Sequence, residues 1–367
     1  MSAPLLDVQK LRVSFATDDG VVRAVDGISY SIEAGKTLGI VGESGSGKSV
    51  SALSTLGLTR TPGAQIVGRM MFGGQDLLKL SDEQLRAIRG NGIAMIFQDP
   101  LSALHPFYTV GTQLVEAVRA HHHVSKAAAR DRAIDLLELV GIPDPHRRVD
   151  QHPHEFSGGM RQRAMIAMAL ANEPKLLIAD EPTTALDVTV QAQILALLSD
   201  LQRRLGMAII IITHDLGVVA EIADEIAVMY AGRIVEHAST QQLFAAPQHP
   251  YTWGLLKAIP RLGSPRGEEL VPISGRPPSM INRPSGCHFH PRCPYVRDAH
   301  KRADPSLEPV PDDPGHEVAC LLDHKVRAQI WQGLQAGNTP ASLRQLAEPA
   351  AASQTTRTRP LAKEGGG

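Results

Sequence analysis

Short apolar runs recur along the chain, and each of them ends at polar or glycine-rich residues. Three such runs cover residues 38–41, 176–179 and 208–213. Unbroken apolar runs of this length are typical of parallel strands that are covered on both faces. A helix is predicted from about 188 to 205, between the last two runs. The sequence therefore predicts an α/β domain with a parallel sheet.

Other patterns predict antiparallel strands and a helical insert. Residues 5–15 and 21–32 have the character of strands, and an Asp-Gly dipeptide typical of hairpin turns lies between them. A second hairpin is predicted within residues 226–237. From about 110 to 170 nearly every segment favours helix. We therefore expect an antiparallel pair before the parallel sheet, a helical insert within it and a hairpin at its end.

Composition narrows the classes of function. The chain of 367 residues carries 37 lysines and arginines against 38 acidic residues, a net charge of −1. This balance provides no electrostatic reason to expect a nucleic-acid partner. The first residues lack the basic and apolar segments of a secretory signal, and no window approaches the roughly 18 apolar residues of a membrane span. We therefore expect a cytosolic protein that reaches a membrane only through a partner.

A glycine-rich loop follows the first apolar run and precedes a helix-compatible segment. It matches the phosphate-loop pattern G-x-x-x-x-G-K-[ST]. Its glycines allow successive N–H groups to wrap a polyphosphate at a helix N-terminus, Lys48 would reach the β- and γ-phosphates, and Ser49 would contact Mg²⁺. The alternative is a flexible turn that contains a lysine. The predicted ATP-binding residues are Gly42, Glu43, Ser44, Gly45, Ser46, Gly47, Lys48, Ser49 and Val50.

Carboxylates and a histidine follow the other two apolar runs. Asp180 and Glu181 end the second run, and His214 follows the third. Because the carboxyl ends of parallel strands share one sheet edge, we expect these residues beside the phosphate loop. Asp180 would hold Mg²⁺, Glu181 would deprotonate the attacking water, and His214 would contact the γ-phosphate. The alternative is a strand that simply ends in charged residues.

Two further features concern the nucleotide. Phe15 ends the first predicted strand and is a candidate for stacking on an adenine ring, with a position in the core as an equal alternative. Ser157, Gly158 and Gly159 directly precede a helical run, so their N–H groups and hydroxyl suit an anion. The chain thus has two phosphate-binding devices but one carboxylate pair. We therefore expect the second device to serve the nucleotide of another subunit.

These motifs, together with Gln98 and Asp187, stand in the order and spacing of the ATP-binding cassette (ABC) ATPases, which the chain resembles from about residue 5 to 258. The family signature usually reads Leu-Ser-Gly-Gly-Gln, and here Phe156 and Met160 replace its outer positions. The resemblance implies a phosphate-loop ATPase fold with a mixed sheet, an antiparallel β subdomain and a helical subdomain. It also implies a head-to-tail dimer around two ATP molecules, with Asp187 crossing the interface. Gln98 would be a catalytic residue that senses the γ-phosphate, and also a ligand of Mg²⁺.

A narrower resemblance rests on residues 98–106, 248–252 and 286–294. These segments are similar to those of the ATP-binding subunits of bacterial dipeptide and oligopeptide importers. The resemblance implies a peripheral subunit, on the cytoplasmic face of the cell membrane, that hydrolyses ATP to power peptide import. Its partners would be a second ABC ATPase subunit, identical or related, two transmembrane permease subunits and a substrate-binding protein. The alternatives are nickel or glutathione import, or a soluble ABC ATPase that acts on nucleic acid.

All three cysteines lie late in the chain, between residues 287 and 320. Members of the peptide-importer group often carry four cysteines here, which ligate an iron–sulfur cluster, and this chain has a histidine where the remaining cysteine is expected. Three thiolates and an imidazole suit either a [4Fe–4S] cluster or zinc. The alternative is small core cysteines and a surface histidine. The predicted ligands are Cys287, Cys293, His300 and Cys320.

Composition also predicts the domain organisation. Residues 1–260 are expected to form the nucleotide-binding domain, with the helical subdomain at about 100–170. Proline and glycine become frequent after this point, which predicts a small irregular extension at 261–326 that holds the cysteines. The tail at 327–367 is rich in small and polar residues and is expected to be partly disordered.

Overall fold

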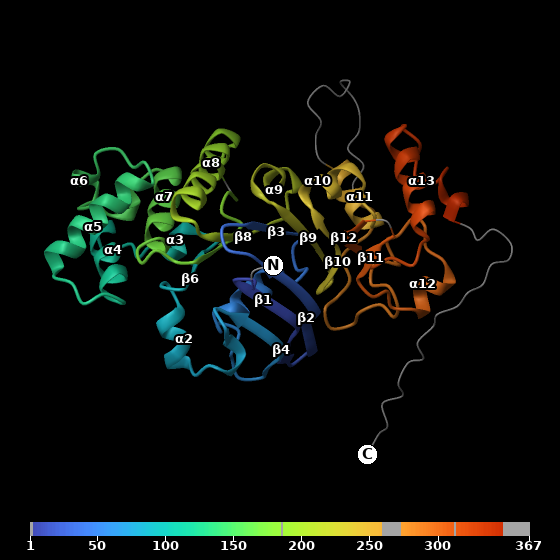
Figure 1. Cartoon of the computed structure of the whole chain (residues 1–367), viewed down its shortest axis with the longest axis horizontal. Coiled ribbons are helices and arrows are strands. Elements are labelled where there is room, and N and C mark those ends of the chain that lie inside the picture. Colours follow the sequence, from blue (N-terminus) through green and yellow to red (C-terminus); the bar gives the residue numbers. More distant parts are fainter. Residues whose placement is uncertain (1–2, 185, 259–272, 312, 348–367) are drawn as a thin grey trace, which may run out of the picture.

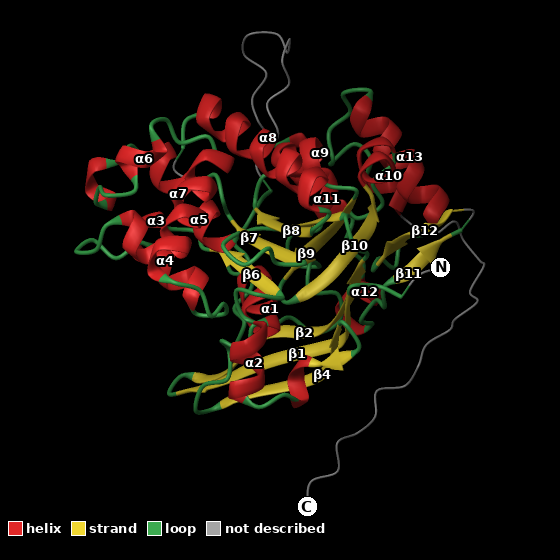
Figure 2. Cartoon of the chain, turned by 60° about the vertical axis from the view of Figure 1, so that its left-hand side comes forward, coloured by secondary structure: helices red, strands yellow, loops and turns green. Residues whose placement is uncertain are grey.

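Two β-sheets and a layer of helices make up the part of the chain that the computed structural model describes, which is residues 3–184, 186–258, 273–311 and 313–347. Within those residues, the smaller sheet has four strands and the larger has eight. The two sheets face each other, and helices cover the opposite face of the larger one (Figure 2). The predicted fold class, an α/β domain with a mixed sheet, an antiparallel subdomain and a helical subdomain, is confirmed.

The smaller sheet is antiparallel and begins the chain. Its order is β2-β1-β4-β5. The predicted hairpin is confirmed, because β1 and β2 pair along their length and Thr17 lies opposite Gly20 at the turn. β1 pairs on its other side with β4, a strand that our reading of the sequence did not include. The strands are β1 (Leu6–Thr17), β2 (Gly20–Ile32), β4 (Ala64–Phe72) and β5 (Gln75–Asp76).

The larger sheet is parallel in its centre and antiparallel at one edge. Its order is β11-β12-β10-β9-β3-β8-β7-β6, in which β9, β3, β8, β7 and β6 are parallel. The carboxyl ends of the central strands therefore share one edge, where ligands of such sheets bind. The strands are β3 (Thr37–Val41), β6 (Ile93–Ile96), β7 (Leu176–Asp180), β8 (Ala208–Thr213), β9 (Glu225–Tyr230), β10 (Arg233–Ser239), β11 (Glu308–Val310) and β12 (Asp313–Val318).

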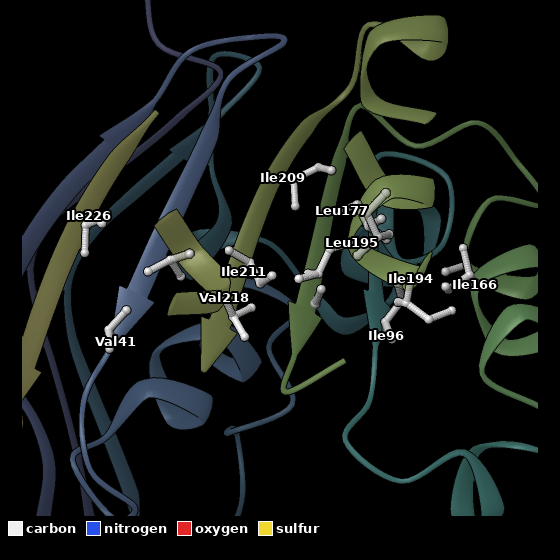
Figure 3. Close-up of a cluster of buried hydrophobic side chains, with 14 of the residues drawn as sticks. Val41, Ile96, Ile166, Leu177, Ile194, Leu195, Ile209, Ile211, Val218 and Ile226 are labelled. Atoms are coloured by element: carbon white, nitrogen blue, oxygen red, sulfur yellow. The ribbon is translucent and has the colours of Figure 1, made fainter. Parts of the chain in front are cut away.

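The isoleucines of β8 show why its apolar run is unbroken. Ile209 and Ile211 face the helices, whereas Ile210 and Ile212 face the smaller sheet. Successive side chains of a strand point to opposite faces, so a strand covered on both faces needs apolar residues at every position. Figure 3 shows the helix-side cluster, in which Ile211 lies beside Val218.

Most helices form either a layer over the larger sheet or a separate group at one end of the molecule, whereas α1 and α2 pack against the core between the two sheets. The group comprises α3 to α7, lies at the left of Figure 1 and corresponds to the predicted helical insert. The helical elements are α1 (Lys48–Thr55), η1 (Leu77–Lys79), α2 (Asp82–Ile88), α3 (Pro100–Ala103), α4 (Val110–Arg119), α5 (Lys126–Leu139), α6 (Pro145–Arg148), η2 (Pro153–Glu155), α7 (Gly158–Ala169), α8 (Val188–Leu205), α9 (Leu216–Ile222), α10 (Thr240–Ala245), α11 (Pro250–Lys257), α12 (Asp298–Arg302), α13 (His324–Gln335) and η3 (Arg344–Ala347).

The C-terminal extension packs against the other end of the larger sheet. β12 pairs with β10, and the buried carboxylate of Glu236 in β10 accepts backbone N–H bonds from Gln248 and His249 and contacts His316 at 2.7 Å. α13 forms an ordered helix at the start of the predicted tail. The predicted domain boundary near 260 and the end of the tail lie outside the described residues, at 259–272 and 348–367.

A transmembrane helix needs about 20 predominantly apolar residues. Among the described residues, no helix is both long enough and apolar enough to cross a membrane.

Candidate functional site

The predicted phosphate loop joins β3 to α1, as the motif requires. Gly45 and Gly47 adopt φ angles of 77° and 99°, in the left-handed region that favours glycine. A Cβ atom at Gly42 would lie 2.1 Å from the carbonyl oxygen of Met229, and one at Gly47 would lie 2.2 Å from that of Ala24. Both positions therefore exclude side chains because neighbouring strands pass so close.

Lys48 is the charged group of the loop. It is 5% exposed, and its Nζ donates to the carbonyl oxygens of Gly42 and Glu43 at 2.6 and 3.0 Å. Burial lowers its pKa, while the carboxylates of Glu181 and Asp180 act in the opposite direction. The loop backbone thus holds the ammonium group in place, directly beside the N–H groups that could wrap a phosphate.

Ser49 and Asp180 come together beneath the loop. The Ser49 hydroxyl donates to Oδ1 of Asp180 at 3.1 Å, and burial raises the pKa of this carboxyl group. Carboxylate and hydroxyl oxygens are ligands that Mg²⁺ prefers, and a divalent cation would offset the cost of burying the charge. These two residues therefore fit a magnesium ion. Within the described residues no hydrogen bond joins Gln98, the third predicted magnesium ligand, to either of them.

Glu181 contacts the other two predicted catalytic residues. Its Oε2 accepts from Nε2 of Gln98 at 2.9 Å, and its Oε1 lies 3.4 Å from Nδ1 of His214. A φ angle of 47° at Glu181 turns the chain just after β7, and its N–H donates to Ile212 of β8. Asp180 and Glu181 therefore face different partners, as expected of adjacent residues. The structure brings all three predicted catalytic side chains to one place.

Phe15 keeps both of its predicted roles open. It pairs with Val22 and Ala64 in the smaller sheet, and its half-buried side chain packs against the core between the two sheets. Part of the ring is therefore committed to the core, and the remainder stays accessible for stacking on a base.

Ser157, Gly158, Gly159 and Asp187 are not part of this cluster. Ser157 caps α7, since its hydroxyl accepts the N–H of Met160 at 3.3 Å, and Asp187 caps α8 through Val190 at 2.9 Å. Among the described residues, no hydrogen bond or ion pair links these four residues to the loop at 42–49. Asp187 is exposed, and Val188 beside it has 84% of its surface exposed. The capped ends are thus available to another molecule.

The predicted metal ligands of the extension do not assemble into a ligand set. Among the described residues, no group of three or more His, Cys, Asp and Glu side chains is placed to hold a metal ion. Burial raises the pKa of Cys287 to about 11 and also raises the pKa values of Cys293 and Cys320, which favours neutral thiols. The arrangement in this structure therefore does not fit an iron–sulfur cluster or zinc.

The structure contradicts the alternative prediction that His300 is a surface residue. It is 6% exposed, so it is no surface residue, and its Nδ1 accepts the backbone N–H of Arg297 at 2.9 Å in the first turn of α12. Its Nε2 is buried and has no hydrogen-bond partner among the described atoms. The ring is therefore oriented by the helix that carries it.

Our reading of the sequence missed three residues that contact the site. Thr184 donates to Oε2 of Glu181 at 2.8 Å, and its position three residues after the glutamate was the available signal. Tyr251 and Arg292 contact Glu43 of the phosphate loop from α11 and from the extension. No local pattern relates these two to the loop, because more than two hundred residues of chain separate them from it.

Comparison with known proteins places the chain in a family. One family model, described as "ABC transporter", matches residues 25–184, and another, described as "Oligopeptide/dipeptide transporter, C-terminal region", matches residues 235–299. The chain belongs to the ATP-binding cassette transporter ATPases. The dipeptide transport ATP-binding protein DppD of Bacillus subtilis (strain 168) is 55% identical over 331 residues, which are 90% of this chain and 98% of the relative.

Two other relatives are also ATP-binding proteins of peptide transport. DppD of Escherichia coli (strain K12) is 51% identical over 316 residues, covering 86% of this chain and 96% of that protein. The oligopeptide transport ATP-binding protein OppD of Salmonella typhimurium (strain LT2) is 52% identical over 317 residues, covering 86% and 93%. The chain is therefore an ATP hydrolase whose activity is coupled to transport.

Solved structures of similar fold are ABC cassettes. A dimeric, post-hydrolysis structure of the cassette MJ0796 bound to ADP and phosphate matches with a TM-score of 0.58 and 26% identity, covering 64% of this chain and 98% of that one. CbiO1 of Clostridium perfringens, part of a cbiONQ transporter complex, matches with a TM-score of 0.56 and 30% identity, covering 66% and 92%.

Proposed function

We propose that this chain is the ATP-hydrolysing subunit that powers import of dipeptides or oligopeptides through a membrane transporter. The observation that carries the proposal is the Glu181 cluster, in which one carboxylate at the sheet edge meets Gln98 and His214 beside the phosphate loop. The peptide substrate is supported by the printed functions of the relatives and by the matched C-terminal region. The subunit would be peripheral, on the cytoplasmic face of the membrane.

Each residue of the site has a proposed role. The loop at 42–49 and Val50 bind the phosphates, Phe15 stacks on the adenine, and Lys48 turns from the loop carbonyls to the phosphate oxygens. Ser49, Asp180 and Gln98 would hold Mg²⁺, which would neutralise charge on the phosphates. Water attacks the γ-phosphorus while its proton passes to Glu181, and the bond from that phosphorus to the β–γ bridging oxygen breaks. ADP and phosphate result.

His214 has a catalytic role and Thr184 a positioning role in this scheme. His214 would donate a hydrogen bond to the γ-phosphate as charge develops there, and its contact with Glu181 aligns both side chains. Thr184 and Gln98 each donate to the same carboxylate oxygen, which leaves the other oxygen toward His214. The carboxylate therefore has a fixed orientation before a substrate enters.

The complete site would need a second subunit. Ser157, Gly158 and Gly159 would contact the γ-phosphate held by a partner, and Asp187 would cross the interface. Their exposure and their separation from the chain's own loop support this head-to-tail arrangement. The partner is a second ABC ATPase subunit, either this chain or a related one, and the pair would act with two permease subunits and a substrate-binding protein.

Reconstitution tests the proposed function. The chain is purified from membranes with its copurifying subunits and placed in vesicles, and ATP hydrolysis is measured with the binding protein present. Dipeptides or oligopeptides should stimulate hydrolysis and enter the vesicles. Stimulation by nickel or glutathione alone would redirect the proposal to those solutes, and copurification with nucleic acid in place of permeases would remove it.

The [4Fe–4S] cluster or zinc ion predicted at Cys287, Cys293, His300 and Cys320 stays a prediction. The arrangement of these residues in this structure gives it no support. Iron, zinc and sulfide analysis of the full chain, purified without air, tests it. A stoichiometric amount of either metal would support the prediction, and trace amounts would remove it.

A further inference from the structure

The C-terminal extension contacts the phosphate loop at Glu43. Arg292 lies between Cys287 and Cys293, and its Nη1 and Nη2 donate to the two carboxylate oxygens of Glu43 at 2.5 and 3.0 Å. This is the two-pronged geometry in which arginine binds carboxylates most strongly. The Arg292 side chain is 3% exposed and that of Glu43 is 28% exposed, so water competes little for the pair.

Arg292 is held in place by the extension and not by Glu43 alone. Its Nε donates to the carbonyl oxygen of Ser274 at 3.0 Å, and its Nη2 donates to that of Ile273 at 3.2 Å. The guanidinium carbon lies 5.8 Å from the ring centre of Tyr230. Burial alone would lower the pKa of Arg292, but the contact with Glu43 outweighs it and holds the pKa above its usual range. The cation is therefore fixed and permanently charged.

Tyr251 forms a hydrogen bond with the backbone of the same glutamate. The N–H of Glu43 donates to the Tyr251 hydroxyl at 2.8 Å, while the carbonyl oxygen of Glu43 accepts from Lys48 at 3.0 Å. Tyr251 is fully buried, and its ring packs 4.7 Å from that of Tyr230 and 5.5 Å from that of Phe289. The side chain, N–H and carbonyl of this one loop residue thus connect the extension and α11 to the lysine of the loop.

We propose that Arg292 of the C-terminal extension and Tyr251 of α11 are positioning residues for ATP binding, which set the loop conformation through Glu43. The inference rests on the proposed assignment of residues 42–49 as the ATP-binding loop. A phosphate-binding loop must hold several N–H groups and an ammonium group in one arrangement, and a loop that is already ordered binds with a smaller entropic cost. The extension therefore tunes the affinity for ATP as well as packing against the sheet.

The experiment compares variants of the full-length chain. Arg292→Gln and Glu43→Gln each break the pair, and the variant with both substitutions completes a double-mutant cycle. Affinity for a fluorescent ATP analogue with Mg²⁺, KM and kcat for ATP hydrolysis, and thermal unfolding are measured for each. We expect each single variant to raise Kd and KM about tenfold while kcat changes by less than about twofold, because the pair orders the loop and touches no reacting atom.

Three comparisons separate positioning from a general loss of structure. The double variant should be no worse than either single variant, since both remove the same interaction. Arg292→Lys should recover part of the affinity, because it keeps the charge but loses the two-pronged geometry. Arg130→Gln breaks an equally two-pronged but exposed pair with Asp150 in the helical group and should leave KM unchanged.

Tyr251→Phe isolates the backbone contact. It keeps the buried ring and removes only the hydroxyl that accepts the Glu43 N–H, so KM should rise while the melting temperature stays near that of the wild type. Additive effects in the double variant, or a fall in kcat with KM unchanged, would overturn the inference. If Lys48→Ala abolishes nucleotide binding while Arg292→Gln leaves KM unchanged, only this inference fails. If Lys48→Ala binds normally, the assignment of the ATP-binding loop fails first.

Discussion

At the scale of single residues, the site depends on how Glu181 is presented. Its left-handed backbone turns the side chain away from that of Asp180, so one carboxylate meets Ser49 and the other meets Gln98 and His214. Two adjacent acidic residues thereby serve different partners. The separation matters because a base that also held the metal would lose its affinity for the proton.

Glu181→Gln should keep ATP binding and lose hydrolysis. The amide preserves the size of the side chain but cannot accept the proton of water, so turnover should fall by about 10²-fold or more. ATP should then hold the dimer closed, which size-exclusion chromatography with and without ATP would detect. Glu173→Gln, at an exposed carboxylate paired with Arg132, is the control and should behave as wild type. Unchanged phosphate release from the Glu181 variant would assign the base elsewhere.

Gly42→Ala and Gly158→Ala should affect stability in opposite directions. A Cβ at Gly42 would overlap the Met229 carbonyl oxygen, so unfolding free energy should fall by about 1–3 kcal/mol. A Cβ at Gly158 meets nothing within 4 Å, and alanine favours the helix, so stability should stay equal or rise slightly. Urea unfolding measures both. A Gly42 variant as stable as the wild type would contradict the close approach of β9 to the loop.

At the scale of elements, the extension is joined to the cassette by strand pairing. β10 carries β12 on one side and β9 on the other, and His237 of β10 lies between Glu225 and Glu317, with its nitrogens 3.2 and 3.6 Å from their carboxylates. Burial works against the charge of this ring, but the two carboxylates outweigh it and raise the pKa of His237 to about 9. A charged histidine thus links three strands.

The stability of the protein should depend on pH through His237. Its folded pKa lies above the unfolded value near 6.5, so the stabilisation is complete below about pH 6.5 and is lost as pH rises to about 9. The loss should amount to about 1–3 kcal/mol. Unfolding free energies at several pH values measure it, and His237→Gln should flatten the curve. An equally steep curve in that variant would place the titrating group elsewhere.

At the scale of the whole molecule, the two halves of the proposed phosphate site lie in different parts of the chain's fold, and no hydrogen bond among the described residues joins them. The loop at 42–49 starts α1 between the two sheets, whereas Ser157 caps α7 in the helical group (Figures 1 and 2). The proposed head-to-tail dimer would take one half from each subunit. Symmetric pairing then produces two equal sites.

Mixing two inactive variants tests the shared site where the chain pairs with itself. Lys48→Ala supplies an intact Ser157, and Ser157→Arg supplies an intact Lys48, so a mixed dimer has one complete site. Random pairing makes half of the dimers mixed, and about a quarter of wild-type turnover should return. Lys48→Ala mixed with Glu181→Gln should restore nothing, because both residues belong to the same half-site. Absence of recovery in a proven mixed dimer would contradict the head-to-tail site.

Much of the site could be predicted because its parts are local. The loop at 42–49, the carboxylates that end β7 and the cap at Ser157 are each defined by neighbouring residues, and the parallel sheet brings strand ends to one edge. β4 was not predicted because its buried and exposed residues alternate only weakly. The proposed metal ligands failed to assemble because cysteine spacing says nothing about how thiols are oriented.

The sequence by itself determined the central parallel strands, the first hairpin and the helical insert, and it indicated the loop proposed to bind a polyphosphate, because burial on two faces and glycine geometry are encoded in adjacent residues. Only the tertiary structure decided that Arg292 and Tyr251 contact Glu43, and that the His300 ring accepts a hydrogen bond from the N–H of Arg297 at the start of its own helix. Contacts between residues 208 and 249 positions apart depend on the packing of every element between them. That packing is a property of the whole fold, and no local pattern encodes it.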